Sequence, residues 1–311
     1  MLLENSKNQT ARTVVLLATY NGAKYIREFL DSLVAQTYTN FKLIIRDDGS
    51  TDDTLEIIRS YLTRINIEYV VSNARLGPAK SFFELLAKTD DSFDFYFFAD
   101  QDDYWYRTKI ERAITTLSPT KEQVVLYCSR KEYVDENLAH MKYSKIPKVI
   151  SLENALVENI ATGCTIAITR SARELLLENL PNRIIMHDWW FYIVIVSFGK
   201  VIYDTFPSIK YRQHDNNTMG AATNIYQDFN RRLIRFIRKN DDIFLPAMQT
   251  VEFKRCFSSI LKKNQLKLLD SLIDGKTNFI IRLRLTFASS FIRQRWIDTL
   301  ILRVLFLIGR F

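Results

Sequence analysis

The sequence predicts an α/β fold in which helices flank a mostly parallel sheet. Short, continuously apolar runs typical of buried strands occur at 14–18, 41–46, 67–71 and 94–99. Apolar residues at helical spacing separate these runs, at 25–34, 55–61 and 82–86. Strands that alternate with helices indicate parallel pairing with right-handed crossovers, and such sheets bind ligands at the carboxyl ends of their strands.

A polar cluster follows each of these four strands. The clusters are Thr19–Gly22, Asp47–Ser50, Asn73–Gly77 and Asp100–Asp103. Any one of them is compatible with a simple turn, because Asn-Gly is a common turn pair and a serine or threonine caps the helix that follows it. Since the clusters recur after successive strands, we expect all of them to meet at one rim of the sheet and to form a binding site there.

The second half of the chain is less regular. Apolar runs predict strands at 124–129 and 165–169 and extended structure at 200–211, with a polar excursion at 131–148. The segment His187–Phe198 is apolar almost all round, which predicts a buried helix that begins with His187 and Asp188. After Asn224 the spacing of apolar residues is helical to the last residue.

The segment FYFFADQDDYW at 95–105 is the most informative part of the chain. It is a buried strand that ends abruptly in Asp100, Asp102 and Asp103. Carboxylates at the mouth of a buried strand are costly unless a cation or a ligand meets them. Their oxygen atoms suit Mg²⁺ or Mn²⁺, and an ion held in this way commonly carries a substrate diphosphate. The cluster therefore predicts nucleotide-sugar chemistry.

Composition places the chain among globular proteins and argues against disulfide or zinc stabilisation. Its 311 residues are 47% hydrophobic and 13% aromatic, enough to bury a full core. Cys128, Cys164 and Cys256 are far apart and lack the spacing of metal ligands, so we expect each to be a small buried residue. The polar lead at 1–12 passes directly into a strand pattern, which predicts a cytoplasmic protein.

Basic residues are concentrated toward the C terminus. From residue 221 onward there are 17 lysines and arginines against 7 acidic residues, whereas the first 220 residues hold 26 against 28. A basic, apolar tail fits nucleic acid or an anionic membrane surface. No nucleic-acid-binding motif accompanies the charge, so we expect no nucleic-acid partner.

The end of the chain carries an apolar stripe at helical spacing. Its members are Ile297, Leu300, Ile301, Val304, Leu305 and Ile308. The segment is too short and too charged to span a bilayer, which takes about 20 apolar residues. Two interpretations are open: a helix that lies on a membrane surface, or one that packs on the domain or on a second subunit of a homodimer.

Six segments in a fixed order carry a resemblance to a known family. They are ATYNGAKYIREFLDSLVAQTYTNFKLIIRDDGSTDDT, RLGPAKSF, FADQDDYW, NIATGCTIAI, MHDWW and YRQHDNN. Together they resemble family 2 glycosyltransferases of the GT-A fold, and most of all the bacterial rhamnosyltransferases of cell-wall and surface polysaccharides. The resemblance implies a catalytic domain at 13–220, with nucleotide-sugar binding at 13–103 and the acceptor side at 104–220, followed by a basic amphipathic helical tail at 221–311.

The resemblance also implies a donor site. Thr19, Tyr20, Asn21, Asp47 and Asp48 match the segments that hold the nucleobase and ribose. Asp100 and Asp102 match the DxD motif, in which the first carboxylate reaches the ribose or the metal and the last binds the metal; Asp103 is able to share either task. Arg212, Gln213 and His214 lie in the segment near the diphosphate, with His214 a candidate metal ligand. Arg75 and Lys80 either contact phosphate or are solvated.

On the acceptor side, Asp188 matches the catalytic base of inverting enzymes with this fold. The alternative for Asp188 is an acid in the first turn of a helix, stabilised by the helix dipole. Gly163, His187, Trp189 and Trp190 match positions that face the acceptor, although His187 is equally explained as a packed or capping histidine.

The resulting hypothesis is a Mg²⁺- or Mn²⁺-dependent inverting transferase. It moves L-rhamnose from dTDP-rhamnose to a saccharide, expected to be linked to a polyprenyl lipid, at the inner face of the cell membrane. One alternative uses a UDP-hexose as the donor, and another is a non-catalytic scaffold subunit of a membrane-bound assembly complex. A sugar nucleotidyltransferase is disfavoured, because TYNGAKY is not the Gly-rich basic loop expected after its first strand.

Overall fold

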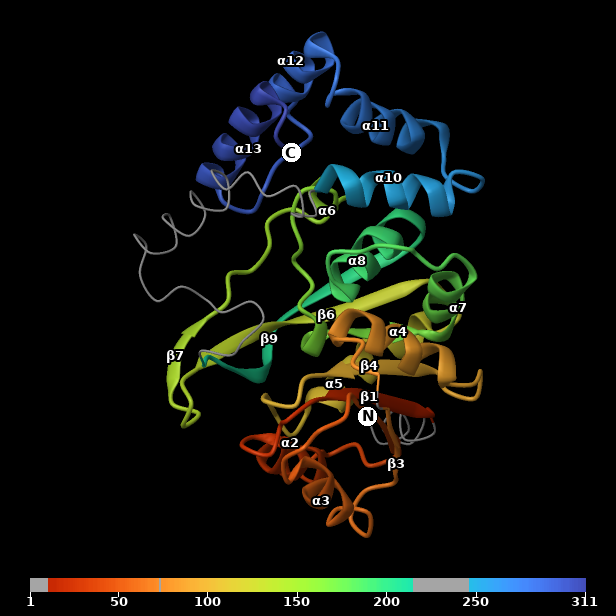
Figure 1. Cartoon of the computed structure of the whole chain (residues 1–311), viewed down its shortest axis with the longest axis vertical. Coiled ribbons are helices and arrows are strands. Elements are labelled where there is room, and N and C mark those ends of the chain that lie inside the picture. Colours follow the sequence, from red (N-terminus) through yellow and green to blue (C-terminus); the bar gives the residue numbers. More distant parts are fainter. Residues whose placement is uncertain (1–10, 73, 215–245) are drawn as a thin grey trace.

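The computed structural model describes residues 11–72, 74–214 and 246–311. The first ten residues, the end of the YRQHDNN segment and the beginning of the basic tail lie outside the described residues. The described strands form one sheet and the described helices pack around it and above it (Figure 1). The cysteines are buried and free, as the sequence predicts.

The sheet contains nine described strands in the order β3-β2-β1-β4-β8-β6-β9-β5, with β7 paired to β6. Their bounds are β1 Thr13–Thr19, β2 Phe41–Asp47, β3 Ile67–Val71, β4 Phe95–Ala99, β5 Tyr104–Trp105, β6 Val125–Val134, β7 His140–Tyr143, β8 Ala167–Thr169 and β9 Lys200–Arg212. The described α-helices are α2 Ile26–Val34, α3 Thr54–Arg59, α4 Pro78–Lys88, α5 Lys109–Leu117, α6 Leu152–Ala155, α7 Arg170–Glu178, α8 His187–Phe198, α10 Pro246–Phe257, α11 Lys263–Asp274, α12 Phe279–Phe287 and α13 Trp296–Ile308.

The first four predicted strands form a parallel unit, as the alternating pattern indicates. β1 pairs in parallel with β2 and β4, and β2 pairs in parallel with β3. Successive side chains of β1 enter different cores: Val14 and Leu16 pack on the face covered by α4 and α8, and Val15 and Leu17 on the face covered by α2 and α5. Burial on both faces explains why β1 and β4 are continuously apolar in sequence. β3 differs, because it lies at the edge of the sheet and none of its residues is fully buried.

The second half of the sheet is mixed, so the expectation of a mostly parallel sheet holds best for the first half. β8 is antiparallel to both β4 and β6, β9 is parallel to β6, and β5 is antiparallel to β9. The polar excursion predicted at 131–148 is in part a hairpin, because β6 extends to Val134 and pairs with β7. Backbone pairing with β9 holds this end of β6 in the sheet whatever the polarity of its side chains.

The C-terminal helices pack on the rest of the described protein through α8. This helix spans His187–Phe198 as predicted, and Trp190 on it contacts Phe253 and Phe257 of α10 edge-on or tilted, at ring-centroid distances of 6.1 and 6.3 Å. Helices α11 to α13 continue away from the sheet, at the opposite end of the molecule from α2 and α3 (Figure 1). Within the described ranges, no helix has the length and apolar character needed to cross a bilayer.

Candidate active site

A cleft of about 810 Å³ opens at the carboxyl ends of β1 and β4 and extends to the start of α8. It brings together most of the side chains that the sequence singles out. Those that line it are Thr19, Tyr20, Asn21, Asp48, Asp100, Asp102, Gly163, His187, Asp188, Trp189 and His214, together with Arg75. Asp47, Lys80, Trp190, Arg212 and Gln213 do not line it.

Asp47 joins two loops rather than facing the cleft. Its carboxylate is fully buried and accepts hydrogen bonds from the Thr19 hydroxyl at 2.8 Å and from the Ser50 backbone N–H and hydroxyl at 2.7 and 2.6 Å. These bonds tie the end of β1 to the turn after β2. The geometry therefore gives Asp47 a role in shaping these two loops, since its oxygen atoms are already used by the protein.

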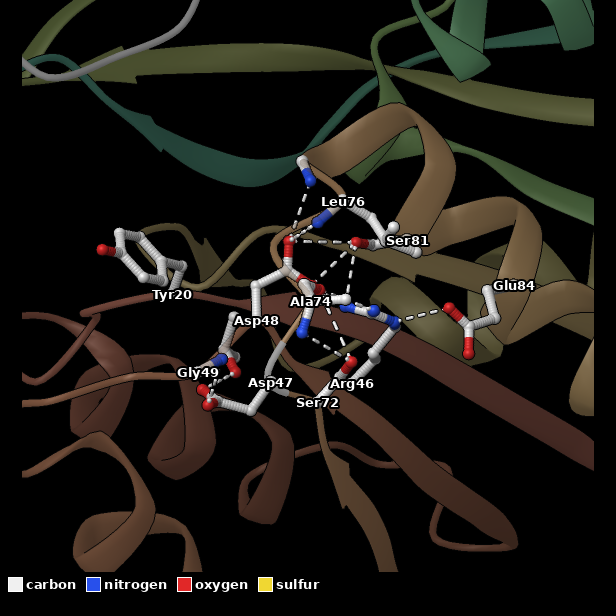
Figure 2. A network of polar contacts seen from close by, with 12 residues as sticks. Tyr20, Arg46, Asp47, Asp48, Gly49, Ser72, Ala74, Leu76, Ser81 and Glu84 are labelled. Atoms are coloured by element: carbon white, nitrogen blue, oxygen red, sulfur yellow. Dashed lines mark hydrogen bonds and ion pairs between the residues drawn. The ribbon is translucent and has the colours of Figure 1, made fainter. Parts of the chain in front are cut away.

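Asp48 organises the next loop from inside the cleft (Figure 2). It forms an ion pair with the buried Arg46, and its carboxylate accepts backbone N–H bonds from Leu76 at 3.1 Å and Gly77 at 2.9 Å. Arg46 in turn donates to Glu84 of α4 at 2.8 Å. Because a buried charge is stable only when it is paired and hydrogen-bonded, this network fixes the approach of the β3–α4 loop to the end of β2.

Tyr20 connects the first loop to the acid cluster, which we define as Asp100, Asp102 and Asp103. Its backbone N–H donates to the Gln101 side chain at 3.0 Å, and its carbonyl accepts from the same amide at 3.1 Å. The Arg75 guanidinium lies over the Tyr20 ring, 3.9 Å from its centre, at the mouth of the cleft. Lys80 is exposed on α4 and does not reach the cleft.

The acid cluster is electrostatically strained, as the sequence predicts for carboxylates at a strand end. Burial, together with the charges of Asp102 and Asp188, raises the pKa of Asp100 to about 7. Burial and the charges of Asp102 and Asp100 hold the pKa of Asp103 well above its ordinary value. One carboxyl oxygen of Asp103 is buried without a hydrogen-bond partner among the described residues. Unpaired acids of this kind favour a bound cation.

Two groupings in this region have possible metal ligands. Asp100, Asp103 and Cys164 place one ligand atom each within 4.8 Å of one another. The pKa of the Cys164 thiol is raised well above its ordinary value by burial, so the sulfur stays protonated, and a thiol is a poor ligand for Mg²⁺ or Mn²⁺. Asp102 and His214 face the cleft instead, with 2.7 Å between the Asp102 carboxylate and His214 Nε2. Oxygen and imidazole donors at the mouth of the cleft fit Mn²⁺ better.

Arg212 is buried next to the acid cluster and holds it through hydrogen bonds. Its guanidinium is buried, donates to the Asp102 carbonyl at 2.9 Å and pairs with Glu28 of α2 at 2.5 Å, and its backbone N–H donates to Asp103 at 3.2 Å. Gln213 continues this strand, with its backbone N–H bonded to the Val134 carbonyl at 2.9 Å. Arg212 thus holds the end of β9 against the acid cluster, Gln213 holds it against β6, and neither residue lines the cleft.

Asp188 lies at the start of α8 and lines the cleft. Its carboxylate accepts backbone N–H bonds from Gly163 at 3.1 Å and from Trp189 at 2.6 Å. Burial raises its pKa to about 6, although the backbone bonds oppose that rise. A side chain at position 163 would place its Cβ atom 2.9 Å from His187 Nε2, so the close approach of the Gly163 loop to α8 requires glycine.

His187 and the two tryptophans that follow have different surroundings. Both ring nitrogens of His187 are buried without partners among the described residues, and burial lowers its pKa to about 3, so the ring is neutral. The ring packs on Phe82, 4.2 Å between centroids, and lines the cleft. Trp189 also lines the cleft and donates from its indole to the Ala155 carbonyl at 2.6 Å. Trp190 packs against α10 in the core and does not line the cleft.

The cleft also contains residues that the sequence motifs do not indicate. Lys131 of β6 donates to the Thr162 hydroxyl at 2.7 Å beside the Asp188 loop. Glu158 and Arg293 line the cleft 3.8 Å apart, and Arg293 belongs to the connection between α12 and α13. No local pattern marks Arg293, because its place in the cleft depends on how the C-terminal helices pack. The C-terminal region therefore contributes directly to the wall of the cleft.

The fold and cleft define an α/β protein with acidic side chains in a cleft at the carboxyl ends of parallel strands, and comparison with known proteins narrows that class. The family model for glycosyl transferase family 2 matches residues 14–180. The chain therefore belongs to glycosyl transferase family 2. It is 32% identical over 237 residues to the dTDP-rhamnosyl transferase RfbG of Shigella flexneri, covering 69% of this chain and 77% of that protein.

Solved structures agree on the fold. Staphylococcus aureus TarS in complex with UDP-GlcNAc matches with a TM-score of 0.58 at 18% identity, over 96% of this chain and 93% of that one. The mannosyltransferase PcManGT of Pyrobaculum calidifontis in complex with GDP-Man and Mn²⁺ matches with a TM-score of 0.52 at 16% identity, over 97% and 87%. At these identities the likeness establishes the GT-A fold.

Proposed function

We propose that this glycosyltransferase inverts the anomeric centre and transfers L-rhamnose from dTDP-rhamnose to a saccharide acceptor. The observation that carries the proposal is the position of Asp188. It lies in the same cleft as the acid cluster, close enough that its charge raises the pKa of Asp100. A cleft with acids for the diphosphate on one side and a separate carboxylate on the other suits inversion, which attacks the sugar from the face opposite the leaving group.

In the proposed mechanism, Asp188 takes the proton of an acceptor hydroxyl. The hydroxyl oxygen then forms a bond to the anomeric carbon while the bond from that carbon to the diphosphate oxygen breaks, and dTDP leaves. A base is most effective when its pKa is near the working pH, and the pKa of about 6 at Asp188 meets that condition. The two backbone N–H bonds fix the carboxylate in one orientation.

Neighbouring residues position the two substrates in this proposal. Tyr20, Asn21 and Asp48 shape the pocket for the nucleoside, and Arg75 lies where it can meet a phosphate. His187 offers a neutral ring with an unused donor and acceptor, which suits a sugar hydroxyl. Trp189 presents an aromatic side chain to the acceptor.

Mg²⁺ or Mn²⁺ is the proposed cofactor, held by Asp102 and His214 with Asp100 beside them. A divalent ion bound there supplies positive charge that neutralises the diphosphate as it leaves. The protein residues contribute ligands and their orientation: Arg212 holds the Asp102 backbone, and the His214 ring stacks on Tyr25 with 5.1 Å between centroids.

The likeness to RfbG supports rhamnose as the transferred sugar. The proposed acceptor is a saccharide on a polyprenyl lipid, and the protein is proposed to act peripherally at the cytoplasmic face of the cell membrane. The basic, apolar C-terminal region supports that location.

A donor panel tests the proposal. Purified protein is given Mn²⁺ and a rhamnose-bearing acceptor with dTDP-rhamnose, UDP-glucose, UDP-GlcNAc or GDP-mannose, and nucleoside diphosphate release and thermal shift are measured. We expect dTDP release and stabilisation with dTDP-rhamnose. Release of UDP instead would show that the donor is a UDP-sugar, and the assignment as a glycosyltransferase would stand. Absence of turnover and of hydrolysis with every donor would favour the scaffold alternative.

A further inference from the structure

The outer face of α12 and α13 is unusually apolar for a surface. Phe287 is 76% exposed and Trp296 is 77% exposed. The two helices pack against each other at the end of the molecule (Figure 1). We define the α12–α13 face as the exposed apolar residues Phe279, Ile280, Leu283, Phe287, Trp296, Ile297, Leu300, Val304, Leu307 and Ile308.

The exposed residues are the outer stripes of helices whose inner stripes are already packed. Leu285, Leu302 and Phe306 are buried, and Phe306 contacts Phe291 and Phe311. Part of the apolar stripe at 297–308 therefore stays exposed. Leu300 and Val304 face solvent although α13 packs on the rest of the protein through other residues. Packing on the domain, one of the two alternatives for this stripe, therefore does not account for its outer half.

Arginine is the dominant charged residue around this face. The segment 279–311 holds six arginines and one acid, Asp298, which is buried. No carboxylate among the described residues lies within ion-pair distance of Arg282, Arg284 or Arg303. The face therefore combines large apolar side chains with positive charge that the described part of the protein leaves uncompensated.

We propose that the α12–α13 face docks on a lipid bilayer that carries anionic head groups. Exposed tryptophan, phenylalanine and leucine next to arginines match an interface where acyl chains lie beneath negative phosphates. A second copy of the chain is the less suitable occupant, because a symmetric contact would bring two sets of Arg282, Arg284 and Arg303 together, and no described carboxylate lies within ion-pair distance of these three.

The connection between α12 and α13 is bonded directly to segments beside the cleft. Gln294, between α12 and α13, accepts the Lys148 backbone N–H at 2.7 Å and donates to the Val149 carbonyl at 2.6 Å. Its own backbone N–H donates to Glu158 at 2.6 Å, beside Arg293 in the cleft wall. Resting on the proposed function, this link places the acceptor end of the cleft near the surface that carries a lipid-linked saccharide.

Vesicle flotation tests the docking face without donor or acceptor. The full-length protein is mixed with phosphatidylcholine vesicles, with or without phosphatidylglycerol, and the bound fraction is measured against salt. The test variants are Phe287→Ser with Trp296→Ser, and Arg284→Gln with Arg303→Gln. Leu62→Ser with Leu180→Ser, two exposed leucines far from the face in sequence, serve as the matched control. Circular dichroism and thermal melting verify that each variant is folded.

We expect binding to the anionic vesicles only, weakened by salt. Each arginine removed should lower the partition coefficient about fivefold, and loss of the two aromatic side chains should lower it further. The control pair should bind like the unaltered protein. Equal binding to neutral vesicles, an equal loss in the control pair, or a dimer that the aromatic variants dissociate would each overturn the proposal.

Activity on a water-soluble acceptor separates this inference from the proposed function. The surface variants should transfer sugar to such an acceptor at the unaltered rate, because none of their residues lines the cleft. A protein that binds anionic vesicles but transfers no sugar would leave the docking face standing and overturn the function. A protein that transfers sugar but never binds vesicles would overturn the docking face and leave the proposed function standing.

Discussion

The two walls of the cleft differ in how the buried polar groups that line them, or lie directly behind them, are satisfied. On the wall built by β1 and β2, the protein itself supplies partners: Asp47 is bonded to Thr19 and Ser50, and Asp48 to Arg46 and the loop before α4. On the wall built by the end of β4 and the start of α8, an oxygen of Asp103 and both ring nitrogens of His187 have no partner among the described residues.

This difference indicates which part is formed in advance and which part depends on ligands. A wall with satisfied hydrogen bonds keeps its shape without substrate, whereas buried acids with raised pKa values destabilise the folded state until a cation or substrate meets them. We infer that the first wall is a preformed nucleoside pocket. The second wall has buried polar groups that the described protein leaves without partners, and under the proposed function these groups are completed when the substrates and the metal bind.

Asp188→Asn tests the wall built by the end of β4 and the start of α8. Its effect on activity should be the largest of those predicted. The amide cannot take the acceptor proton, so kcat should fall by about 10² to 10⁴. Donor binding, measured by thermal shift with dTDP-rhamnose, should be unchanged because the donor side is intact. Full turnover by this variant would show that Asp188 is not the base.

Asp48→Asn tests the preformed wall. It leaves Arg46 buried with a weaker partner and removes the charge that holds the Leu76 and Gly77 backbone N–H groups. Loss of a buried pair costs about 3–5 kcal/mol, and we expect the lower end of that range in urea unfolding because Glu84 also pairs with Arg46. A variant as stable as the unaltered protein would contradict the assignment of this wall as a self-supporting network.

Asp102→Asn and His214→Asn examine the proposed metal ligands. Each variant should bind Mn²⁺ at least about tenfold more weakly. The measurement is the rise in melting temperature as Mn²⁺ is added. The matched control is His140→Asn, which removes another histidine that contacts a carboxylate, Glu132 at 2.7 Å, outside the cleft. An equal loss of metal response in the control would mean that the response does not report on this site.

The pH dependence of metal-free stability is the smallest expected effect. Asp100 and Asp188 have folded-state pKa values of about 7 and about 6, above the ordinary value of 3.8. Between these values the folded protein keeps protons that the unfolded chain has lost, so unfolding free energy should decline as pH rises from about 4 to about 7. Asp100→Asn should flatten the decline measured by thermal melting in chelator. A stability that rises over this range would contradict the raised pKa values.

Sequence patterns alone determined much of the parallel half of the fold and the place of its rim. Strands buried on both faces must be continuously apolar, and their carboxyl ends must share one edge, so Asp48 and Asp100 meet as expected. The sequence also predicted α8 as a buried helix, because a helix that is apolar on all sides is rare outside a core. The family resemblance placed Asp188 and Gly163 in one site, and both residues line the same cleft.

Only the tertiary structure decided which way individual side chains face and what the distant segments add. Asp47, Arg212 and Trp190 belong to informative motifs, yet their side chains are bonded or packed inside the protein, because a motif gives position along the chain and not direction in space. Arg293 enters the cleft through packing of α12 and α13, which no local pattern encodes. Whether an apolar stripe is buried or exposed depends likewise on its neighbours in the fold, and those neighbours are set by long-range contacts.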